Sequence, residues 1–445
     1  AIFMEQGISS TAAILGVLKA GMSFILIPPE TPSSRINAYW EETDHPIFLT
    51  TNQYKHIVIE ITKDDSVILL DELPKIPQDF VFAGSDAAPE DMAAIFYTSG
   101  STGEPKGVIW THELILHTAF LNTQSYSITS EDKIAILSAF GYGAAMTMSF
   151  AAMLNGAALC FYPTPQQTPA AFLQWISENN ISILSMTTLG LLRQVLHEMR
   201  GPSSLKKVRM VILGGDDLYR ADVNLFFDKF PMDTIFVYRL AGSETMLMRE
   251  IKITPSTKLL TDKVPVGYEV PDKELLLLNE ELKPVSKEEV GEIAIRSRYL
   301  SPGYWKQPEL TAKKFLKDPV NGDMRIYLTG DLGKLNGLGQ LEFLGRKDNM
   351  VKVRGFSVQL EAIEQRLVAI RGIKEAVVVL RSWQGRSRLT AYLKSEGSDK
   401  PSANKIKNEL GFSITRNVPQ GLLEIYKILK DGFLVEPYSN KFSNS

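Results

Sequence analysis

The chain has 445 residues, 44% of them hydrophobic, and a formal net charge of −3. A chain of this length can bury a large core and is expected to form about two or three domains. Acidic and basic residues are interspersed, which argues against nucleic acid or an anionic membrane as a partner.

Cysteine usage and apolar runs narrow the class of protein further. Cys160 is the single cysteine, which excludes a disulfide framework and a thiolate metal site, and its apolar neighbours predict a buried thiol. No run approaches the ~18 apolar residues of a membrane span, and the first residues lack a signal pattern. We therefore expect a cytoplasmic protein without a membrane partner. The chain begins without Met, and we expect it to be a piece of a longer protein whose N-terminal part is missing.

Helical and strand patterns alternate over the first half of the chain. Apolar residues at helical spacing predict a helix at residues 8–21, and short apolar runs predict strands at 23–29, 57–59 and 67–70. Further helices are predicted at 110–122, 143–154, 169–179 and 186–199, between apolar runs at 133–138, 157–162, 181–185 and 209–214. This alternation indicates stacked helix–strand units over a largely parallel sheet.

The pattern changes at residue 264 to strands and turns, with strands predicted at 275–278, 292–295 and 341–344. A compact pattern then follows, with strand 350–353, helix 359–370 and strands 375–381 and 388–394. We therefore predict an α/β fold with two domains. Residues 1–346 form a large domain of stacked helix–strand layers plus a β-rich subdomain, and residues 347–445 form a small α+β domain.

The most informative stretch is a small-residue loop that follows the apolar run 92–96. It reads Thr98-Ser99-Gly100-Ser101-Thr102-Gly103-Glu104-Pro105-Lys106-Gly107. Its glycines let the backbone approach a large anion, its hydroxyls can donate to that anion, and Lys106 can neutralise it. It is not the mononucleotide P-loop, because it lacks the Gly-Lys-Ser/Thr ending and Pro105 interrupts a helix start. An ordinary polar loop does not explain this concentration of residues, so we interpret it as a polyphosphate site.

Three further motifs combine small residues with an acid. The glycines of Leu213-Gly214-Gly215-Asp216 would let a flat base or an apolar group lie against the backbone. A plain strand-to-helix turn would have the same sequence pattern. Glu244 follows two small residues and could hold a magnesium ion that bridges phosphates, or could be a solvated loop residue. Asp331 in Tyr327-Leu328-Thr329-Gly330-Asp331 is expected in a turn, where it could accept both ribose hydroxyls or be an ordinary turn residue.

Together these motifs resemble those of the adenylate-forming enzymes, a family that includes acyl-CoA synthetases, luciferases and the adenylation domains of nonribosomal peptide synthetases. The resemblance covers nearly the whole chain and is greatest to an adenylation domain of a loading module. Gln359-Leu360-Glu361-Ala362-Ile363-Glu364 favours the synthetase domains. The resemblance implies that a carboxylate attacks the α-phosphate of ATP, with Mg²⁺, to give an acyl-adenylate and pyrophosphate.

The resemblance also implies roles for single residues. It assigns nucleotide contacts to Thr98, Ser99, Gly100, Ser101, Thr102, Gly103, Lys106, Gly214, Ser243, Asp331 and Arg346. It makes Thr98 and Glu244 catalytic, Glu244 as the metal ligand, and Asp348 the hinge between domains. The catalytic Lys of the small domain is assigned to Lys441, with Lys427 and Lys430 as alternatives. Arg354-Gly355-Phe356 would line the tunnel of a phosphopantetheine thiol, and Pro302-Gly303-Tyr304-Trp305 matches a segment with a structural role.

Gly143 carries most of the information on substrate. It falls where amino-acid-activating domains have an Asp that pairs with the substrate ammonium, and a buried ammonium without a carboxylate is strongly disfavoured. We expect an acid without an α-amine: an α-keto acid, an aryl or arylalkyl acid, or a short acyl chain. The other implied pocket positions, mostly small or apolar, are Ala144, Thr147, Ser185, Val211, Leu213, Arg239, Leu247 and Met248. A surface-pointing Arg239 is an equally good interpretation.

The resemblance leaves four functions open. The first is acyl transfer to the phosphopantetheine of a carrier domain, expected in the same longer polypeptide. The second is a free-standing acyl-CoA or aryl-CoA ligase, and the third an amino-acid-activating domain. The fourth, from a different class, is an inactive nucleotide-binding relative.

Overall fold

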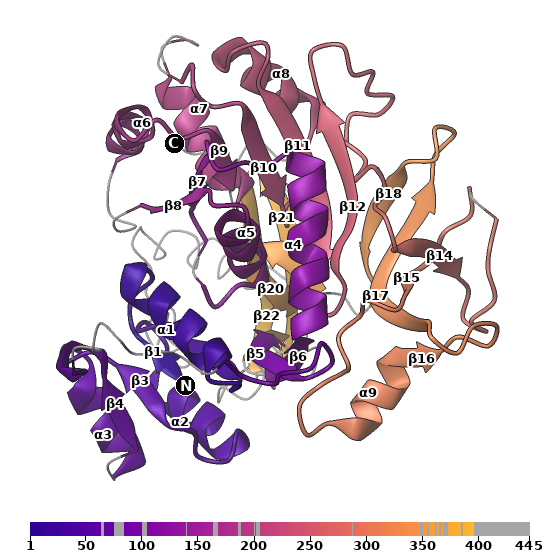
Figure 1. Ribbon diagram of the computed structural model, residues 1–445. Helices are drawn as coiled ribbons and strands as arrows, with labels where there is room; N and C mark the ends of the chain where they lie inside the picture. The colour runs from indigo at the N-terminus through magenta and orange to yellow at the C-terminus, as the bar shows by residue number, and fades with distance from the viewer. Residues whose placement is uncertain are drawn as a thin grey trace. The chain divides into compact units, whose positions relative to one another are not determined.

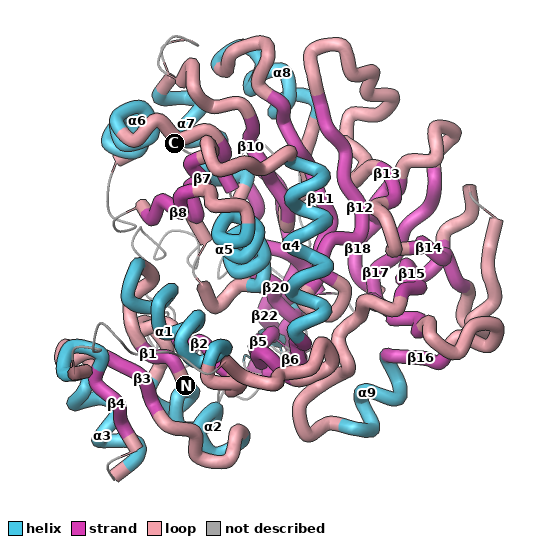
Figure 2. Tube along the Cα trace, in the orientation of Figure 1, coloured by secondary structure: helices cyan, strands magenta, loops and turns pink. Residues whose placement is uncertain are grey.

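The chain is described by a computed structural model (Figures 1 and 2). The described residues are 1–63, 66–74, 84–99, 105–138, 140–162, 168–185, 188–199, 201, 205–286, 288–347, 350–353, 356–360, 363–364, 367, 373–383 and 386–395. They form two compact units, one made of Ala1–Thr98 with Pro105–Leu344, the other of Ser99 and the described residues from Gly345 on. The domain boundary at 346/347 stays a prediction.

A six-stranded sheet forms the N-terminal part of the first unit. Its order is β4-β3-β1-β2-β5-β6, and β1 to β4 pair in parallel, as do β2 and β5. The strands are β1 Ile2–Phe3, β2 Phe24–Ile27, β3 Phe48–Thr50, β4 Val67–Leu69, β5 Met92–Ser99 and β6 Pro105–Thr111. The accompanying helices are α1 Ile8–Lys19, α2 Ser33–Glu42 and α3 Lys55–Thr62, with a single turn of 3₁₀ helix, η1, at Leu70–Glu72.

The strand predicted at 57–59 is wrong, because these residues lie in α3. Three consecutive β-branched residues indicate a strand by propensity. In the structure Val58 and Thr62, four residues apart, are buried, while Ile59 is exposed. Burial at a spacing of four is the pattern of a helix packed on a core, so tertiary packing overrides the local preference.

A seven-stranded sheet forms the centre of the first unit, in the order β13-β12-β11-β10-β9-β7-β8. The strands from β8 to β11 are parallel, and β12 and β13 are antiparallel, which confirms the largely parallel sheet. They are β7 Lys133–Ile136, β8 Ala158–Phe161, β9 Ile183–Ser185, β10 Met210–Gly214, β11 Ile235–Gly242, β12 Met246–Ile253 and β13 Tyr268–Glu269.

Helices α5 Gly143–Leu154, α6 Pro169–Glu178, α7 Leu189–Glu198 and α8 Arg220–Lys229 connect these strands, and α4 His112–Tyr126 leads from β6 into β7. Helices α4 and α5 lie side by side across one face of the sheet (Figure 1). The helix predicted from residue 110 begins at His112, since 105–111 is strand β6. Thr111 ends the strand and caps the helix, its hydroxyl accepting from the Leu114 N–H at 3.2 Å.

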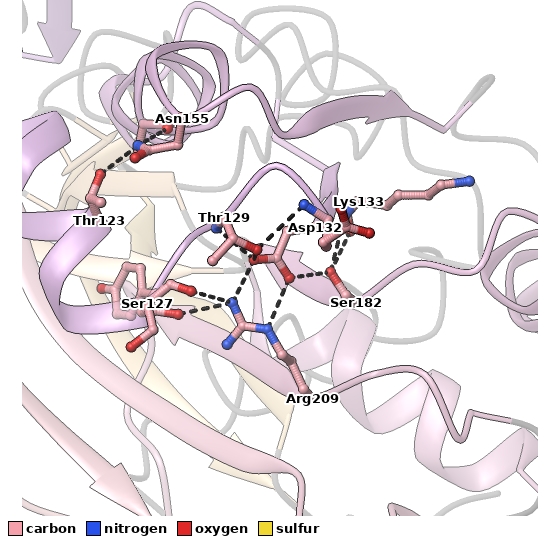
Figure 3. Close-up of polar contacts among 11 residues, drawn as sticks. Thr123, Ser127, Thr129, Asp132, Lys133, Asn155, Ser182 and Arg209 are labelled. Atoms are coloured by element: carbon pink, nitrogen blue, oxygen red, sulfur yellow. Dashed lines mark hydrogen bonds and ion pairs between the residues drawn. The ribbon is translucent and has the colours of Figure 1, made fainter.

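An ion pair between the buried Asp132 and the half-buried Arg209 fixes the starting ends of three sheet strands (Figure 3). Asp132 precedes β7 and accepts from Arg209, just before β10, at 2.8 and 2.9 Å, and from the Ser182 hydroxyl before β9 at 2.7 Å. It also accepts from the Thr129 N–H at 3.0 Å. Burial raises the pKa of Asp132, but these hydrogen bonds and the Arg209 charge outweigh it and hold the pKa below its ordinary value.

The β-rich part of the first unit is an antiparallel sheet in the order β14-β15-β17-β16, with β18 on β17. Its elements are β14 Glu274–Leu278, β15 Gly291–Ser297, α9 Pro308–Lys314, β16 Phe315–Lys317, β17 Arg325–Leu335 and β18 Leu341–Arg346. None of the helices in the described part of the chain has both the length and the apolar composition to cross a membrane.

The described part of the second unit holds two antiparallel pairs. They are β19 Met350–Val353 with β20 Phe356–Gln359, and β21 Ile373–Trp383 with β22 Arg386–Ser395. Leu367, Ile373, Val378 and Leu393 form a small core of their own. The predicted helix 359–370 lies largely outside the described residues, and its first residue, Gln359, belongs to β20.

Candidate functional site

Strands β5 and β6 lead into and out of the predicted phosphate loop. They are neighbours in the six-stranded sheet, and the apolar residues of β5 are buried in the core. The Thr98 hydroxyl lies 3.5 Å from the Lys106 carbonyl oxygen, so both predicted anion-binding residues stand where the loop joins the sheet. Ser99 ends β5. Gly100, Ser101, Thr102 and Gly103 lie outside the described residues, so their nucleotide contacts stay predictions.

The segment that follows Ser301 pairs with β6 beside Lys106. Val108 and Tyr304 form an antiparallel bridge, and the Trp305 N–H donates to the Gly107 carbonyl oxygen at 2.7 Å. A Cβ at Gly107 would lie 2.9 Å from a methyl of Ile95, which explains the glycine. The Lys106 ammonium lies 5.8 Å from the centre of the Tyr304 ring, within cation–π range.

Glu244, in the loop between β11 and β12, belongs to the same cluster. The Tyr304 hydroxyl donates to Glu244 Oε1 at 3.0 Å and lies 3.3 Å from the Tyr327 hydroxyl. The Ser301 N–H donates to the Glu244 carbonyl oxygen at 2.9 Å. Burial, with the Glu244 charge, raises the pKa of Tyr327 far above its ordinary value, so this phenol stays protonated. The structure therefore joins Lys106 and Glu244 through Tyr304.

This role of Tyr304 was missed by the sequence analysis, which gave its segment a structural part alone. No local spacing could have revealed it, because the contact joins side chains 60 positions apart. The segment does have a structural part, in its pairing with β6. Its phenol adds a polar contact to the carboxylate predicted to bind metal.

The surroundings of Glu244 fit a magnesium ion that is shared with phosphate groups. Magnesium commonly takes one or two protein carboxylates and completes its shell with phosphate oxygens and water. Glu244 is half-buried, and the Tyr304 hydrogen bond fixes its orientation, as outer partners of metal ligands do. Glu244 would hold the ion, and the ion would supply charge neutralisation at the phosphates.

Asp331 lies on a bulge within strand β17, so the expected turn is wrong. Glu292 pairs with Leu332 and Ala294 with Leu328, which leaves three residues of β17 opposite one residue of β15. Gly330 has a φ of 77°, a conformation that favours glycine. The buried Glu292 carboxylate accepts from the Gly330 N–H at 3.1 Å and holds the bulge. A bulge re-aims a side chain, which is what the predicted ribose contact requires.

Gly143 is the first residue of α5, and a side chain there would approach Trp110 and Ser243. A Cβ built there lies 3.7 Å from the Ser243 hydroxyl and 2.8 Å from Cζ2 of Trp110. Trp110 lies on β6, and its indole N–H donates to the Ser243 carbonyl oxygen at 2.9 Å. The predicted acyl position and the residue before Glu244 are therefore brought together.

The predicted pocket positions do not all share one face of the central sheet. In the observed register Ser185 pairs with Ile212, and Gly214 with Arg239. Side chains alternate along a strand, so Val211 and Leu213 point to the opposite face from Ser185 and Arg239. Ile212 and Gly214 lie on the same face as Ser185 and Arg239. The predicted positions therefore do not all line one side of the sheet, and their roles in the pocket stay predictions.

Arg239 is buried, which contradicts a surface-pointing side chain. Its Nη1 donates to the Tyr126 hydroxyl at 3.3 Å, and that hydroxyl lies 3.2 Å from a Glu250 carboxylate oxygen. Glu250 pairs with Arg239 across β11 and β12, so the guanidinium has a nearby counter-charge. Arg239 also explains Gly214, where a Cβ would lie 2.9 Å from the Arg239 carbonyl oxygen.

The remaining predicted residues fall into three groups. Thr147, Leu247 and Met248 are buried in the first unit, and Ala144 is exposed at the start of α5. Arg346 ends β18, in the second unit. Outside the described residues lie Asp348, Arg354, Gly355, Lys427, Lys430 and Lys441, whose roles stay predictions.

The fold and these residues define an adenylate-forming ligase, the class that the motifs predicted. The chain belongs to the AMP-binding enzyme family, whose model matches residues 1–305.

Curated relatives include large peptide synthetases. The chain is 32% identical to tyrocidine synthase 1 of Brevibacillus parabrevis over 405 residues, covering 90% of this chain and 36% of that protein. It is also 32% identical to surfactin synthase subunit 1 of Bacillus subtilis over 406 residues, covering 89% of this chain and 11% of that protein. The chain thus spans about a third or less of these relatives.

Solved structures with the same fold include two adenylation proteins. One is PA1221, described as an NRPS protein containing adenylation and PCP domains, with a TM-score of 0.77 at 22% identity, covering 98% of this chain and 87% of that one. The other is NpsA-ThdA, an artificially fused adenylation-PCP di-domain from Klebsiella oxytoca. Its TM-score is 0.77 at 20% identity, and the match covers 99% of this chain and 81% of that one. These likenesses confirm the predicted fold.

Proposed function

We propose that the chain activates a carboxylic acid without an α-amine and passes it to a carrier domain of the same longer polypeptide. In the first step a carboxylate oxygen attacks the α-phosphorus of ATP, and the bond to pyrophosphate breaks. Both reactants are already ionised, so no proton has to move. The acyl group then goes to the phosphopantetheine thiol of the carrier, and AMP leaves. The observation that carries the proposal is the Lys106–Tyr304–Glu244 cluster beside Gly143.

The first step needs positioning and charge neutralisation more than acid–base chemistry. Lys106 can neutralise phosphate oxygens next to the loop. Glu244 would hold the magnesium ion, and Tyr304 keeps that carboxylate in place. Asp331 on its bulge would accept from the ribose hydroxyls. Pyrophosphate would then leave from a site in which its negative charge is screened.

Gly143 supports the choice of acid. Its position faces Ser243, next to the catalytic carboxylate, and it offers no charge to a substrate ammonium. An α-keto acid, an aryl or arylalkyl acid, or a short acyl chain avoids this cost. Arg239 is the charged residue among the predicted pocket positions, and its guanidinium already donates to the Tyr126 hydroxyl, which in turn lies 3.2 Å from a Glu250 carboxylate oxygen.

The choice of acceptor rests on the relatives. The chain covers 36% of tyrocidine synthase 1 and 11% of surfactin synthase subunit 1, so both relatives are much longer than this chain. PA1221 and NpsA-ThdA each contain a PCP domain beside the adenylation domain. These names support a carrier domain over free coenzyme A. Offering the protein both a holo-carrier domain and coenzyme A, and weighing the products by mass spectrometry, distinguishes the two acceptors.

The first step is tested by ATP–pyrophosphate exchange across keto, aryl, fatty and amino acids. We expect exchange with acids that lack an α-amine. Exchange with α-amino acids alone would establish the amino-acid-activating alternative. Absence of exchange with every acid, by a folded protein that binds ATP, would establish the inactive relative.

A further inference from the structure

The indole of Trp110 occupies the space that a side chain at position 143 would need. A Cβ at Gly143 would lie 2.8 Å from Cζ2 and 3.0 Å from Cη2 of that ring. A real Cβ essentially never lies closer than 3.0 Å to another atom, so the 2.8 Å contact would require either the ring or α5 to move. Any residue larger than glycine at position 143 therefore competes with Trp110.

Packing contacts and a hydrogen bond hold the Trp110 ring in place, and rotating the ring would break them. Trp110 is 0% exposed, and its ring packs on Phe96 with the centroids 3.9 Å apart and the planes at 34°. Phe96 in turn packs edge-on against Phe24. The indole N–H donates to the Ser243 carbonyl oxygen at 2.9 Å, so rotation would leave a buried donor and acceptor unpaired. The indole of Trp110 is therefore held in place beside position 143.

We propose that Trp110 is a specificity-determining residue of the acyl site. Its six-membered ring fills the volume that an aspartate at position 143 requires, so the pair Trp110–Gly143 excludes the partner of a substrate ammonium. Trp110 leaves room only for glycine at position 143, so both residues together set the preference for an acid without an α-amine. This inference rests on the proposed function, in which position 143 offers no charge to a substrate ammonium.

The pair makes a prediction that Gly143 alone does not. If the glycine alone set the specificity, Gly143→Asp would give an enzyme that accepts α-amino acids. If Trp110 blocks that side chain, the aspartate is accommodated only when residue 110 is also smaller. Valine suits the strand position of Trp110.

The experiment compares four proteins: the unchanged chain, Gly143→Asp, Trp110→Val and the double variant. Each is assayed by pyrophosphate exchange with matched acids, such as 4-methyl-2-oxopentanoate against leucine and phenylpyruvate against phenylalanine. Melting temperature is measured in parallel. Gly190→Asp is the matched control, because Gly190 lies in the first turn of α7 and a Cβ there meets nothing within 4 Å.

We expect Gly143→Asp to lower the melting temperature without gaining exchange with amino acids, whereas Gly190→Asp melts as the unchanged chain does. The double variant should melt above the value expected from adding the two single changes. Its preference for the amino acid over the matched acid should rise by about ten- to a hundredfold, the usual worth of a hydrogen bond to a charged group.

Two results would overturn the inference. One is a Gly143→Asp protein that melts normally and accepts amino acids with Trp110 in place. The other is a folded double variant that still exchanges with the oxo acid and shows no gain with the amino acid. Should Trp110→Val unfold the protein, Trp110→Phe removes the same ring atoms with a smaller loss of core, and strictly additive melting temperatures in that pair would also count against it. An unchanged chain that prefers amino acids contradicts the proposed function instead.

Discussion

The Tyr304 hydroxyl donates a 3.0 Å hydrogen bond to Glu244 Oε1, and the Tyr304 ring lies 5.8 Å from the Lys106 ammonium. One side chain therefore contacts the carboxylate predicted to bind metal and the cation predicted to bind phosphate. Its backbone is held by the bridge to Val108, next to the phosphate loop. We infer from this arrangement that Tyr304 positions both side chains for the proposed first half-reaction.

Replacing Tyr304 by Phe should weaken the magnesium site more than the fold. Loss of an outer partner commonly lowers metal affinity about 10- to 100-fold, so the Mg²⁺ concentration for half-maximal exchange should rise by about tenfold. Mn²⁺ binding in the presence of ATP, followed by electron paramagnetic resonance, should weaken in parallel. Tyr268→Phe is the control, since that exposed phenol only accepts from Gln340. An unchanged Mg²⁺ requirement in Tyr304→Phe would remove Tyr304 from the site.

Replacing Gly330 by Ala should disturb the bulge that carries Asp331. Gly330 has a φ of 77°, and a non-glycine residue in that region costs roughly 1–2 kcal/mol. The variant should unfold at lower urea concentration and show a raised KM for ATP. Gly322→Ala, at an exposed glycine without such a φ, should change stability by less than about 0.5 kcal/mol. A normal KM for ATP in Gly330→Ala would show that the bulge does not position the nucleotide.

Replacing Asp132 by Ala should destabilise the first unit. The change leaves the Arg209 guanidinium, the Ser182 hydroxyl and the Thr129 N–H without their shared acceptor. We expect a loss of about 2–4 kcal/mol in the free energy of unfolding, below the full value of a buried pair because Arg209 is partly exposed. Lys133→Ala, at the exposed neighbouring side chain, should have little effect. Equal stabilities of the two variants would contradict the structural role of the pair.

His117 should make stability depend on pH between about 4 and 6.5. Burial lowers the pKa of His117 to about 4 from 6.5, against the smaller opposing effect of Asp272. Between these values the unfolded chain binds more protons, so stability falls as the pH falls through this window. His117 changes the free energy of unfolding by about 3 kcal/mol at most over this pH range.

The pH effect is measured by urea unfolding at several pH values. The His117 ring stacks on the Tyr299 ring with the ring centroids 3.7 Å apart. His117→Phe keeps an aromatic ring at this place, and the new side chain cannot be protonated. Its stability should fall less steeply with acid than that of the unchanged chain. The exposed His56→Gln should keep the original slope. The same slope in both variants would assign the pH dependence to other groups.

Long, strongly patterned elements could be predicted from the sequence. Helix α5 has the predicted bounds 143–154, and the strand before the phosphate loop was expected from its apolar run. Local patterns suffice there, because burial follows the period of the element. Helix α3 was predicted as a strand since its β-branched residues outweighed the spacing of Val58 and Thr62.

The candidate site was predictable where a motif is contiguous and less so where it depends on register or distant contacts. The observed register places Val211 and Leu213 on the opposite face from Arg239, which matching the motif to β10 could not show. Trp110 was expected in a helix, so its approach to Gly143 could not be foreseen. The Tyr304–Glu244 contact joins two loops that only the folded sheets bring together.

The central claim, activation of an acid without an α-amine, is tested most directly by competition. The protein is given ATP, Mg²⁺ and an equimolar pair of acids with the same side chain, one a 2-oxo acid and one an α-amino acid. Hydroxylamine traps each acyl-adenylate, and the two hydroxamates are weighed by mass spectrometry. We predict that the hydroxamate of the acid without the amine dominates for the preferred side chain. Dominance of the amino acid hydroxamate for every side chain tested would contradict the account.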